Sequence, residues 1–174
     1  ANPLSKLGID KYKYFLISLH REENVDNEKN LFKIMETLDA IYEEYKLPII
    51  VSTHPRTKIK LNSLGYNSNK NVNFLKPFGF FDYIKLQIEA CCTISDSGTI
   101  TEEASILNLP AITIRNSHER PEGMDAGLLI MSGLNKFRVL DAVSITIDHF
   151  KKNKFVTNKI NDFSDYNISN KILK

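Results

Sequence analysis

The segment SDSGTITEEA at 95–104 combines small, hydroxyl and acidic residues, and it is the strongest candidate for a ligand site in the sequence. Ser97, Gly98 and Thr99 follow a short apolar segment and precede an amphipathic one, so we predict that they lie where a strand passes into a helix. Backbone N–H groups at the start of a helix carry a partial positive charge and bind phosphate. The loop is therefore predicted to hold the phosphates of a nucleotide.

The same residues also fit a simple helix cap, and the sequence leaves both interpretations open. Asp96 or Ser97 suits the N-cap position, with Thr99 and Glu102 forming a capping box. A capped helix start is also what an anion site is built on. Glu102 and Glu103 are neighbours and cannot share one face of a helix. One of them can serve the cap while the other turns toward the hydroxyls of a ligand.

Histidine and arginine side chains follow other predicted strands. His20 and Arg21 end one apolar run, and His54 ends the next. Histidine gains and loses a proton near neutral pH, so it can act as an acid, a base or a phosphate donor. The alternative is a loop histidine that is hydrogen-bonded to the backbone.

Arg120, in the charged segment SHERPEG at 117–123, has two interpretations. It can grip a phosphate with two N–H groups, or it can form a surface ion pair with Glu119 or Glu122 that contributes little.

Four aromatic residues cluster in the segment PFGFFDY at 77–83. They can offer a stacking surface to a nucleobase, but their helical spacing places most of them in the core. These residues are Phe78, Phe80, Phe81 and Tyr83.

Apolar runs alternate with amphipathic segments along the chain. Predicted strands occupy 12–20, 47–53, 71–77, 91–95, 111–115 and 127–133, and predicted helices occupy 27–46, 54–65, 79–90, 99–109 and 135–153. Strands that are apolar along their whole length and alternate with helices indicate a parallel sheet covered on both faces. The predicted fold is a doubly wound α/β domain, in which ligands lie beyond the carboxyl ends of the strands.

Length, charge and cysteine content exclude several classes of partner and cofactor. The 174 residues suffice for one core, and the net charge of +2, from 23 basic and 21 acidic residues, argues against a nucleic-acid partner. Cys91 and Cys92 are adjacent, so they form neither a disulfide with each other nor a structural zinc site. With no apolar run of about 20 residues and no signal segment, we predict a cytoplasmic protein with no membrane partner and no metal.

Five short motifs occur in a fixed order: HREEN at 20–24, HPR at 54–56, SDSG at 95–98, EEA at 102–104 and ERPEG at 119–123. This ordered set resembles the C-terminal half of the UDP-N-acetylglucosamine 2-epimerase family, whose enzymes have two Rossmann-like domains in the GT-B arrangement. The resemblance covers most of the chain.

The resemblance implies a role for each candidate residue. Residues 97–99 match the loop that holds the pyrophosphate of UDP, and Glu103 matches the carboxylate on the ribose hydroxyls. Arg120 matches a phosphate-binding arginine, and Tyr83 an aromatic residue beside the uracil. His20 matches the histidine near the diphosphate that is implicated in catalysis. The family often has two glycines after the serine, where this chain has Gly98 followed by Thr99.

The family's chemistry is inversion at C2 of the sugar. The C2 proton is removed while UDP leaves C1, and UDP adds back to the glycal after reprotonation on the other face, with no metal or nicotinamide cofactor. The segment HERPEGMDAG at 118–127 is similar to the branch that forms UDP-N-acetyl-L-fucosamine for surface polysaccharides.

The resemblance also implies a missing half. The family's proton-transferring carboxylates come from an N-terminal domain, which we expect to be absent from this chain. Residues 1–174 are then a UDP-binding C-terminal domain that does not epimerise alone, with 155–174 as the start of a crossover tail. The full enzyme is expected to be a homodimer.

Two alternatives share the predicted fold. One is the nucleotide-binding half of a GT-B glycosyltransferase, and the other is a non-catalytic UDP-sugar sensor domain.

Overall fold

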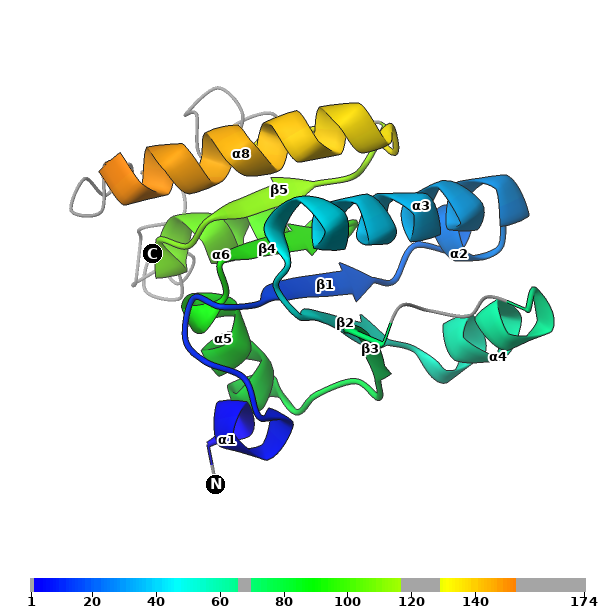
Figure 1. Cartoon of the computed structure of the whole chain (residues 1–174), viewed down its shortest axis with the longest axis horizontal. Coiled ribbons are helices and arrows are strands. Elements are labelled where there is room, and N and C mark those ends of the chain that lie inside the picture. The colour runs from blue at the N-terminus through cyan, green and yellow to red at the C-terminus, as the bar shows by residue number, and fades with distance from the viewer. Residues whose placement is uncertain (1, 66–69, 117–128, 153–174) are drawn as a thin grey trace, which may run out of the picture.

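The computed structural model describes residues 2–65, 70–116 and 129–152 (Figure 1). These residues form a six-stranded sheet in which every pairing is parallel, in the order β3-β2-β1-β4-β5-β6. The strands are β1 (Phe15–Leu19), β2 (Ile49–Thr53), β3 (Val72–Leu75), β4 (Cys92–Ser95), β5 (Ala111–Thr113) and β6 (Ile130–Met131). The helices are α1 (Pro3–Leu7), α2 (Glu22–Val25), α3 (Glu28–Tyr45), α4 (Pro55–Ser63), α5 (Phe80–Glu89), α6 (Ile100–Leu107) and α8 (Lys136–Lys152).

The strand order confirms the predicted doubly wound sheet. The chain builds outward from β1 to β3, then crosses back to place β4 on the other side of β1. In register, Ser18 of β1 lies opposite both Ser52 of β2 and Ser95 of β4. The connections on either side of β1 and β4 therefore diverge at the carboxyl ends of these two strands, which is the switch point where such folds bind ligands.

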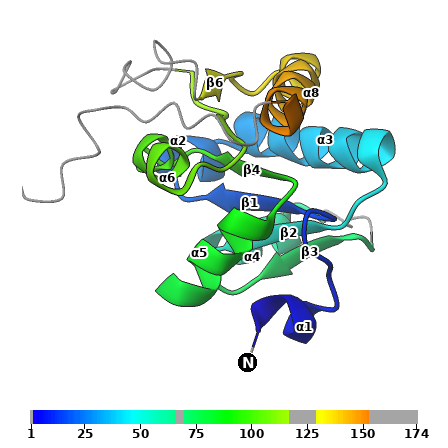
Figure 2. The same cartoon turned by 90° about the vertical axis from the view of Figure 1, so that its left-hand side faces the viewer.

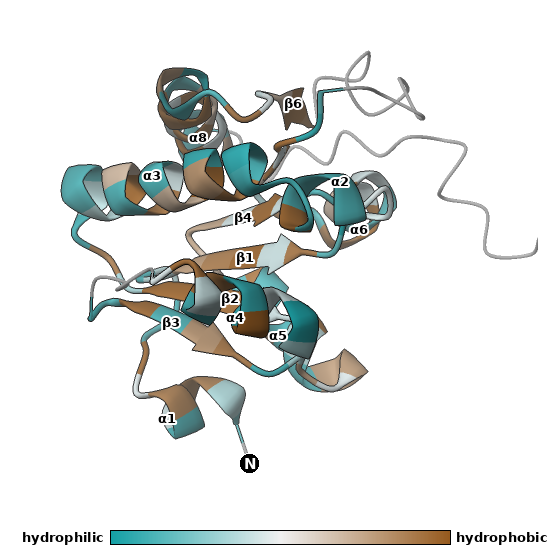
Figure 3. Cartoon of the chain, turned by 90° about the vertical axis from the view of Figure 1, so that its right-hand side faces the viewer, coloured by the Kyte–Doolittle hydropathy of each residue, from teal (hydrophilic) through white to brown (hydrophobic). Residues whose placement is uncertain are grey.

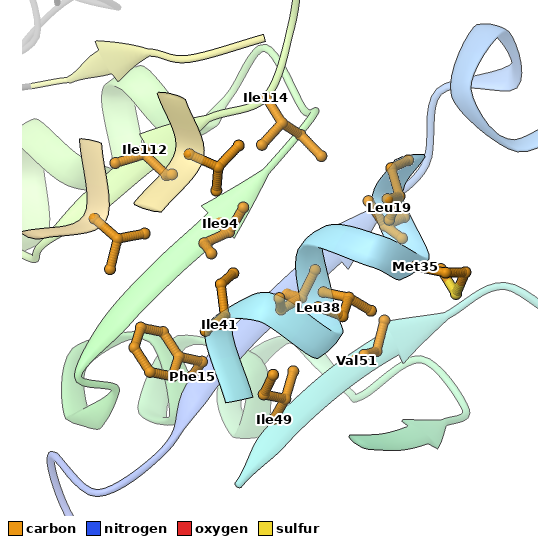
Figure 4. Close-up of a cluster of buried hydrophobic side chains, with 14 of the residues drawn as sticks. Phe15, Leu19, Met35, Leu38, Ile41, Ile49, Val51, Ile94, Ile112 and Ile114 are labelled. Carbon is orange, nitrogen blue, oxygen red and sulfur yellow. The ribbon is translucent and has the colours of Figure 1, made fainter. Parts of the chain in front are cut away.

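Helices cover both faces of the sheet. Figures 1 and 2 show α3 and α8 side by side over one face, with α5, α6 and α1 on the other. The larger core lies under α3 and α8, where Leu38 and Ile41 pack over Phe15 and Ile94 (Figure 4). A smaller core on the opposite face joins Leu86 of α5 to the strands.

Helix α3 shows how the sequence produces this packing. The Asn27 side chain caps the helix by accepting hydrogen bonds from the N–H groups of Lys29 and Asn30. The helix ends at Lys46, which takes a left-handed backbone conformation. Its buried stripe follows helical spacing, and each fully buried aliphatic side chain contributes about 1.5–3 kcal/mol. The aliphatic members of the stripe are Leu31, Ile34, Met35, Leu38 and Ile41.

Two short helices were not predicted. Helix α1 is capped by the Asn2 side chain and ends at Gly8, whose φ of 63° is readily available to glycine. Helix α2 overlaps the end of the polar HREEN segment and includes Val25.

The prediction that most aromatic residues near α5 are core is wrong for two of them. Phe80 and Phe81 are 73% and 85% exposed, and their rings meet edge to face. They occupy the first turn of α5, which begins before the part of the helix that packs on the sheet. Phe78 and Tyr83 do pack against the smaller core.

In Figure 3 the helices carry both polar and apolar residues, as expected of helices with one face toward the sheet, and much of the strand backbone is apolar. Within 2–65, 70–116 and 129–152, no helix is both long and apolar enough to cross a membrane.

Candidate functional site

The candidate site lies at the carboxyl ends of β1 and β4, on the side of the molecule that faces the viewer in Figure 3. His20 and Arg21 follow β1, and Asp96 and Ser97 follow β4. The parallel pairing of β1 with β4 therefore brings the HREEN and SDSGT motifs together at the switch point.

Asp96 is a buried anchor between these two motifs. Its side chain is fully buried and accepts hydrogen bonds from the N–H groups of His20 (2.8 Å) and Arg21 (3.1 Å). It also accepts one from the side-chain amide of Asn24 (3.0 Å), while the Arg21 Nε donates to its backbone carbonyl (3.4 Å). The prediction of Asp96 as a helix cap is wrong, because this carboxylate holds the end of β1 and the start of α2.

The start of α6 also differs from the predicted capping box. Thr99 is the N-cap residue, and no side chain caps the helix. The N–H of Ser97 donates to Ser95 Oγ (3.0 Å), and the N–H of Thr99 donates to Ser97 Oγ (3.3 Å). Two of the three amides that we predicted to face a phosphate are thus hydrogen-bonded to serine hydroxyls. The hydroxyls of Ser97 and Thr99 lie 3.0 Å apart at the same loop.

Glu103 is held by two helices. Its Oε1 accepts a hydrogen bond from the Thr99 hydroxyl at 2.9 Å, and its Oε2 accepts one from the side-chain amide of Gln87 at 2.5 Å. Gln87 belongs to α5 and Glu103 to α6. The half-buried carboxylate is therefore fixed in orientation rather than free to rotate.

Tyr83 is half-buried near the carboxylates of Glu103 and Asp96. Burial raises the pKa of its phenol to about 12, and the negative charges of Glu103 and Asp96 add to this effect. Hydrogen bonding with the side chains of Ser18 and Gln87 offsets part of the rise in pKa. Ser18 Oγ is 2.7 Å from His20 Nε2.

The raised pKa of Tyr83 predicts a loss of stability in alkali. The folded-state pKa lies above the usual value of 10.0, so the stabilisation is complete below about pH 10 and is lost as pH rises toward 12. For Tyr83→Phe we expect the free energy of unfolding to fall less steeply over this range, by up to about 1.4 kcal/mol per pH unit. Urea unfolding at a series of pH values measures both slopes.

Some slope is expected to remain in that variant, because burial also raises the pKa of Tyr14. Equal slopes for the wild type and Tyr83→Phe would contradict the prediction.

His54 has a local structural role. Its side chain accepts a hydrogen bond from the N–H of Arg56 (3.3 Å) at the start of α4, with Pro55 as the first helical residue. Arg56 reaches Asp26 (2.8 Å) beyond the end of α2. The backbone-bonded interpretation of His54 is confirmed.

Two other predicted features, Arg120 and the segment 155–174, lie outside the described residues. In the described ranges, no three His, Cys, Asp or Glu side chains are grouped so as to hold a metal ion.

Sequence reasoning missed three members of the site: Ser18, Asn24 and Gln87. A serine inside an apolar strand and a glutamine inside an apolar helix are both departures from pattern that signal a buried polar role. Each is at most 3% exposed.

Comparison with known proteins identifies the family. The family model described as UDP-N-acetylglucosamine 2-epimerase matches residues 2–174. A curated enzyme of that name from Methanocaldococcus jannaschii is 40% identical over 152 residues, covering 84% of this chain and 42% of the relative.

Solved structures agree with the family model. UDP-N-acetylglucosamine 2-epimerase from Rickettsia bellii is 45% identical with a TM-score of 0.83, covering 99% of this chain and 46% of that one. The M. jannaschii enzyme in complex with UDP-GlcNAc and UDP is 35% identical with a TM-score of 0.83, covering 99% and 47%.

The chain thus spans less than half the length of these relatives. Escherichia coli ADP-heptose LPS heptosyltransferase II, at 11% identity and a TM-score of 0.61, shares the fold alone. The predicted fold class, a Rossmann-like sheet of the kind that forms half of a GT-B fold, is confirmed. The chain belongs to the UDP-N-acetylglucosamine 2-epimerase family.

Proposed function

We propose that this chain is the UDP-binding C-terminal domain of an enzyme that inverts C2 of a UDP-N-acetylhexosamine. The observation that carries the proposal is the set of hydrogen bonds through which Asp96 joins the HREEN segment to the loop 97–99, whose Thr99 in turn holds Glu103. It is at the position where doubly wound folds bind nucleotides. The relative solved with UDP-GlcNAc and UDP supports the same ligand class.

The proposed contacts follow the nucleotide from one end to the other. Tyr83 lies beside the uracil, and Glu103 accepts the ribose hydroxyls. The loop 97–99, at the positive end of α6, holds the pyrophosphate together with Arg120. For the amide of Thr99 to reach a phosphate, the Ser97 hydroxyl that now accepts its hydrogen has to turn away.

The proposed reaction places negative charge on the leaving diphosphate. The α6 N-terminus, Arg120 and His20 stabilise this charge as the C1–O bond breaks. Asp96 fixes the backbone of His20, and Ser18 holds its ring. The His20 side chain therefore needs little reorientation as negative charge develops on the diphosphate. The C2 proton is removed by carboxylates of a second domain, and UDP adds back after reprotonation.

That second domain is proposed to be N-terminal, since the chain spans less than half of its relatives. The isolated chain is then inactive in epimerisation, and the full enzyme is a cytoplasmic homodimer. HERPEGMDAG at 118–127 favours UDP-N-acetyl-L-fucosamine formation for surface polysaccharides. A glycosyltransferase half has support only at the level of fold.

Calorimetric titration of the chain with UDP tests the proposal. We expect saturable binding, weakened about tenfold or more in Arg120→Ala because a charge-assisted contact to phosphate is lost. Arg138→Ala, which removes an exposed arginine of α8, is the matched control and should leave the affinity unchanged. Absence of saturable UDP binding, or equal weakening by both substitutions, would contradict the proposal.

A further inference from the structure

We propose that Gln87 is a positioning residue that orients the Glu103 carboxylate toward the ribose of the bound nucleotide. The inference rests on the proposed function and goes beyond it, because Gln87 is buried behind the site and does not touch the ligand. It acts through the Glu103 carboxylate.

The direction of the Gln87 amide follows from its partner. Gln87 is fully buried, and one atom of its amide lies 2.5 Å from Glu103 Oε2. A carboxylate only accepts hydrogen bonds, so the facing atom must be the amide nitrogen. Gln87 belongs to α5, so it holds the Glu103 carboxylate from outside α6.

The oxygen of the Gln87 amide lowers the stability of the fold. This atom, Oε1, is buried and has no hydrogen-bond partner among the described residues. A buried acceptor without a partner is destabilising, and an apolar side chain of the same shape avoids this penalty. Leu86 on α5 and Ala90 just after it are buried in an apolar cluster. In our proposal, the N–H donor that Gln87 supplies to Glu103 outweighs this penalty.

The hydrogen bond from Gln87 is the second donor to the Glu103 carboxylate, and it fixes the orientation of the carboxylate plane. Thr99, the N-cap residue of α6, holds Oε1 from four residues earlier in the chain. With this contact alone the half-buried carboxylate can rotate about its terminal torsion, which is a soft one. Two hydroxyls on adjacent ribose carbons require both oxygens in fixed positions, and loss of orientation lowers affinity without removing any contact group.

The test compares two nucleotides rather than one. UDP and 2′,3′-dideoxy-UDP differ only in the ribose hydroxyls, so the ratio of their affinities measures the Glu103 contact. We expect Gln87→Met to weaken UDP binding about fivefold and to leave dideoxy-UDP binding unchanged. The melting temperature should stay the same or rise, because the unpartnered Oε1 is removed. Leu86→Met, a volume-conserving change at the adjacent buried position, should alter neither affinity.

Two results would overturn the inference. Unchanged affinities for both nucleotides, whatever the melting temperature, would show that Gln87 does not orient Glu103. Equal weakening of both nucleotides would show a general distortion of the site. Gln87→Leu should repeat the result if Gln87→Met does not fold. If the wild-type chain binds dideoxy-UDP and UDP equally, Glu103 does not contact ribose and the inference also fails. If it binds neither, the proposed function fails first.

Discussion

Replacing Asp96 with alanine is expected to lower the free energy of unfolding by about 3–5 kcal/mol. The substitution removes the acceptor for three N–H groups, those of His20, Arg21 and the Asn24 side chain. Asn24 is 3% exposed, so water cannot readily replace the lost oxygen. Each buried donor left without an acceptor destabilises by about 1–3 kcal/mol. Urea unfolding followed by circular dichroism measures the change.

Two variants control this experiment. Asp96→Asn keeps one oxygen acceptor in the same shape and should lose less stability than the alanine variant. Glu22→Ala removes an exposed carboxylate of α2, which contributes little through its surface ion pair with Arg56. A loss below about 1 kcal/mol for Asp96→Ala would mean that the donors find other acceptors and that Asp96 is not the anchor between the two motifs.

Glu103→Ala is expected to weaken UDP binding about 10- to 100-fold. Under the proposed function, the carboxylate accepts hydrogen bonds from the ribose, and a hydrogen bond to a charged group contributes about 1.5–3 kcal/mol. The variant also leaves the buried Gln87 amide without its acceptor, so a loss of about 1 kcal/mol in stability accompanies the change. Calorimetric titration with UDP measures the affinity, and thermal melting measures the stability.

Glu44→Ala is the matched control for this prediction. Glu44 is an exposed glutamate near the end of α3, at the opposite edge of the sheet from the site. Its removal should leave UDP affinity unchanged. Similar UDP affinities for Glu103→Ala and the wild type would show that the carboxylate has only a structural role at the start of α6.

Sequence patterns were sufficient for the large elements of the fold. The five-residue apolar stripe of α3 and the apolar runs of β1 and β2 predict their own burial, because periodicity and hydrophobicity act locally. The exposed ring of Phe81 shows the limit of this reasoning. Helical spacing identifies an apolar face, but whether the first turn of a helix reaches the core depends on tertiary packing.

The position of the site was predictable from the sequence, but the hydrogen-bond partners within it were not. The motifs after β1 and β4 indicate a ligand site because parallel strands end at one edge. The partner of Asp96 could not be deduced, since Asp, Ser and Thr before a helix equally suit a local cap. The donor to Glu103 comes from α5, 16 residues earlier in the chain. Only the tertiary arrangement reveals such contacts, and the roles of Arg120 and His20 remain predictions.

The anchor at Asp96 also has a consequence for the order in which the molecule folds. Asp96 is hydrogen-bonded to His20, which lies 76 positions earlier, whereas β1 and β2 are linked by the shorter segment that contains α2 and α3. Distant contacts form late, because the chain must lose the entropy of a long loop before they stabilise it. A chain that has formed only β1, α3 and β2 therefore has not yet placed the loop 97–99 beside His20. Under the proposed function, UDP selects molecules in which β4 has docked, so the nucleotide stabilises the completed sheet over every partly folded form.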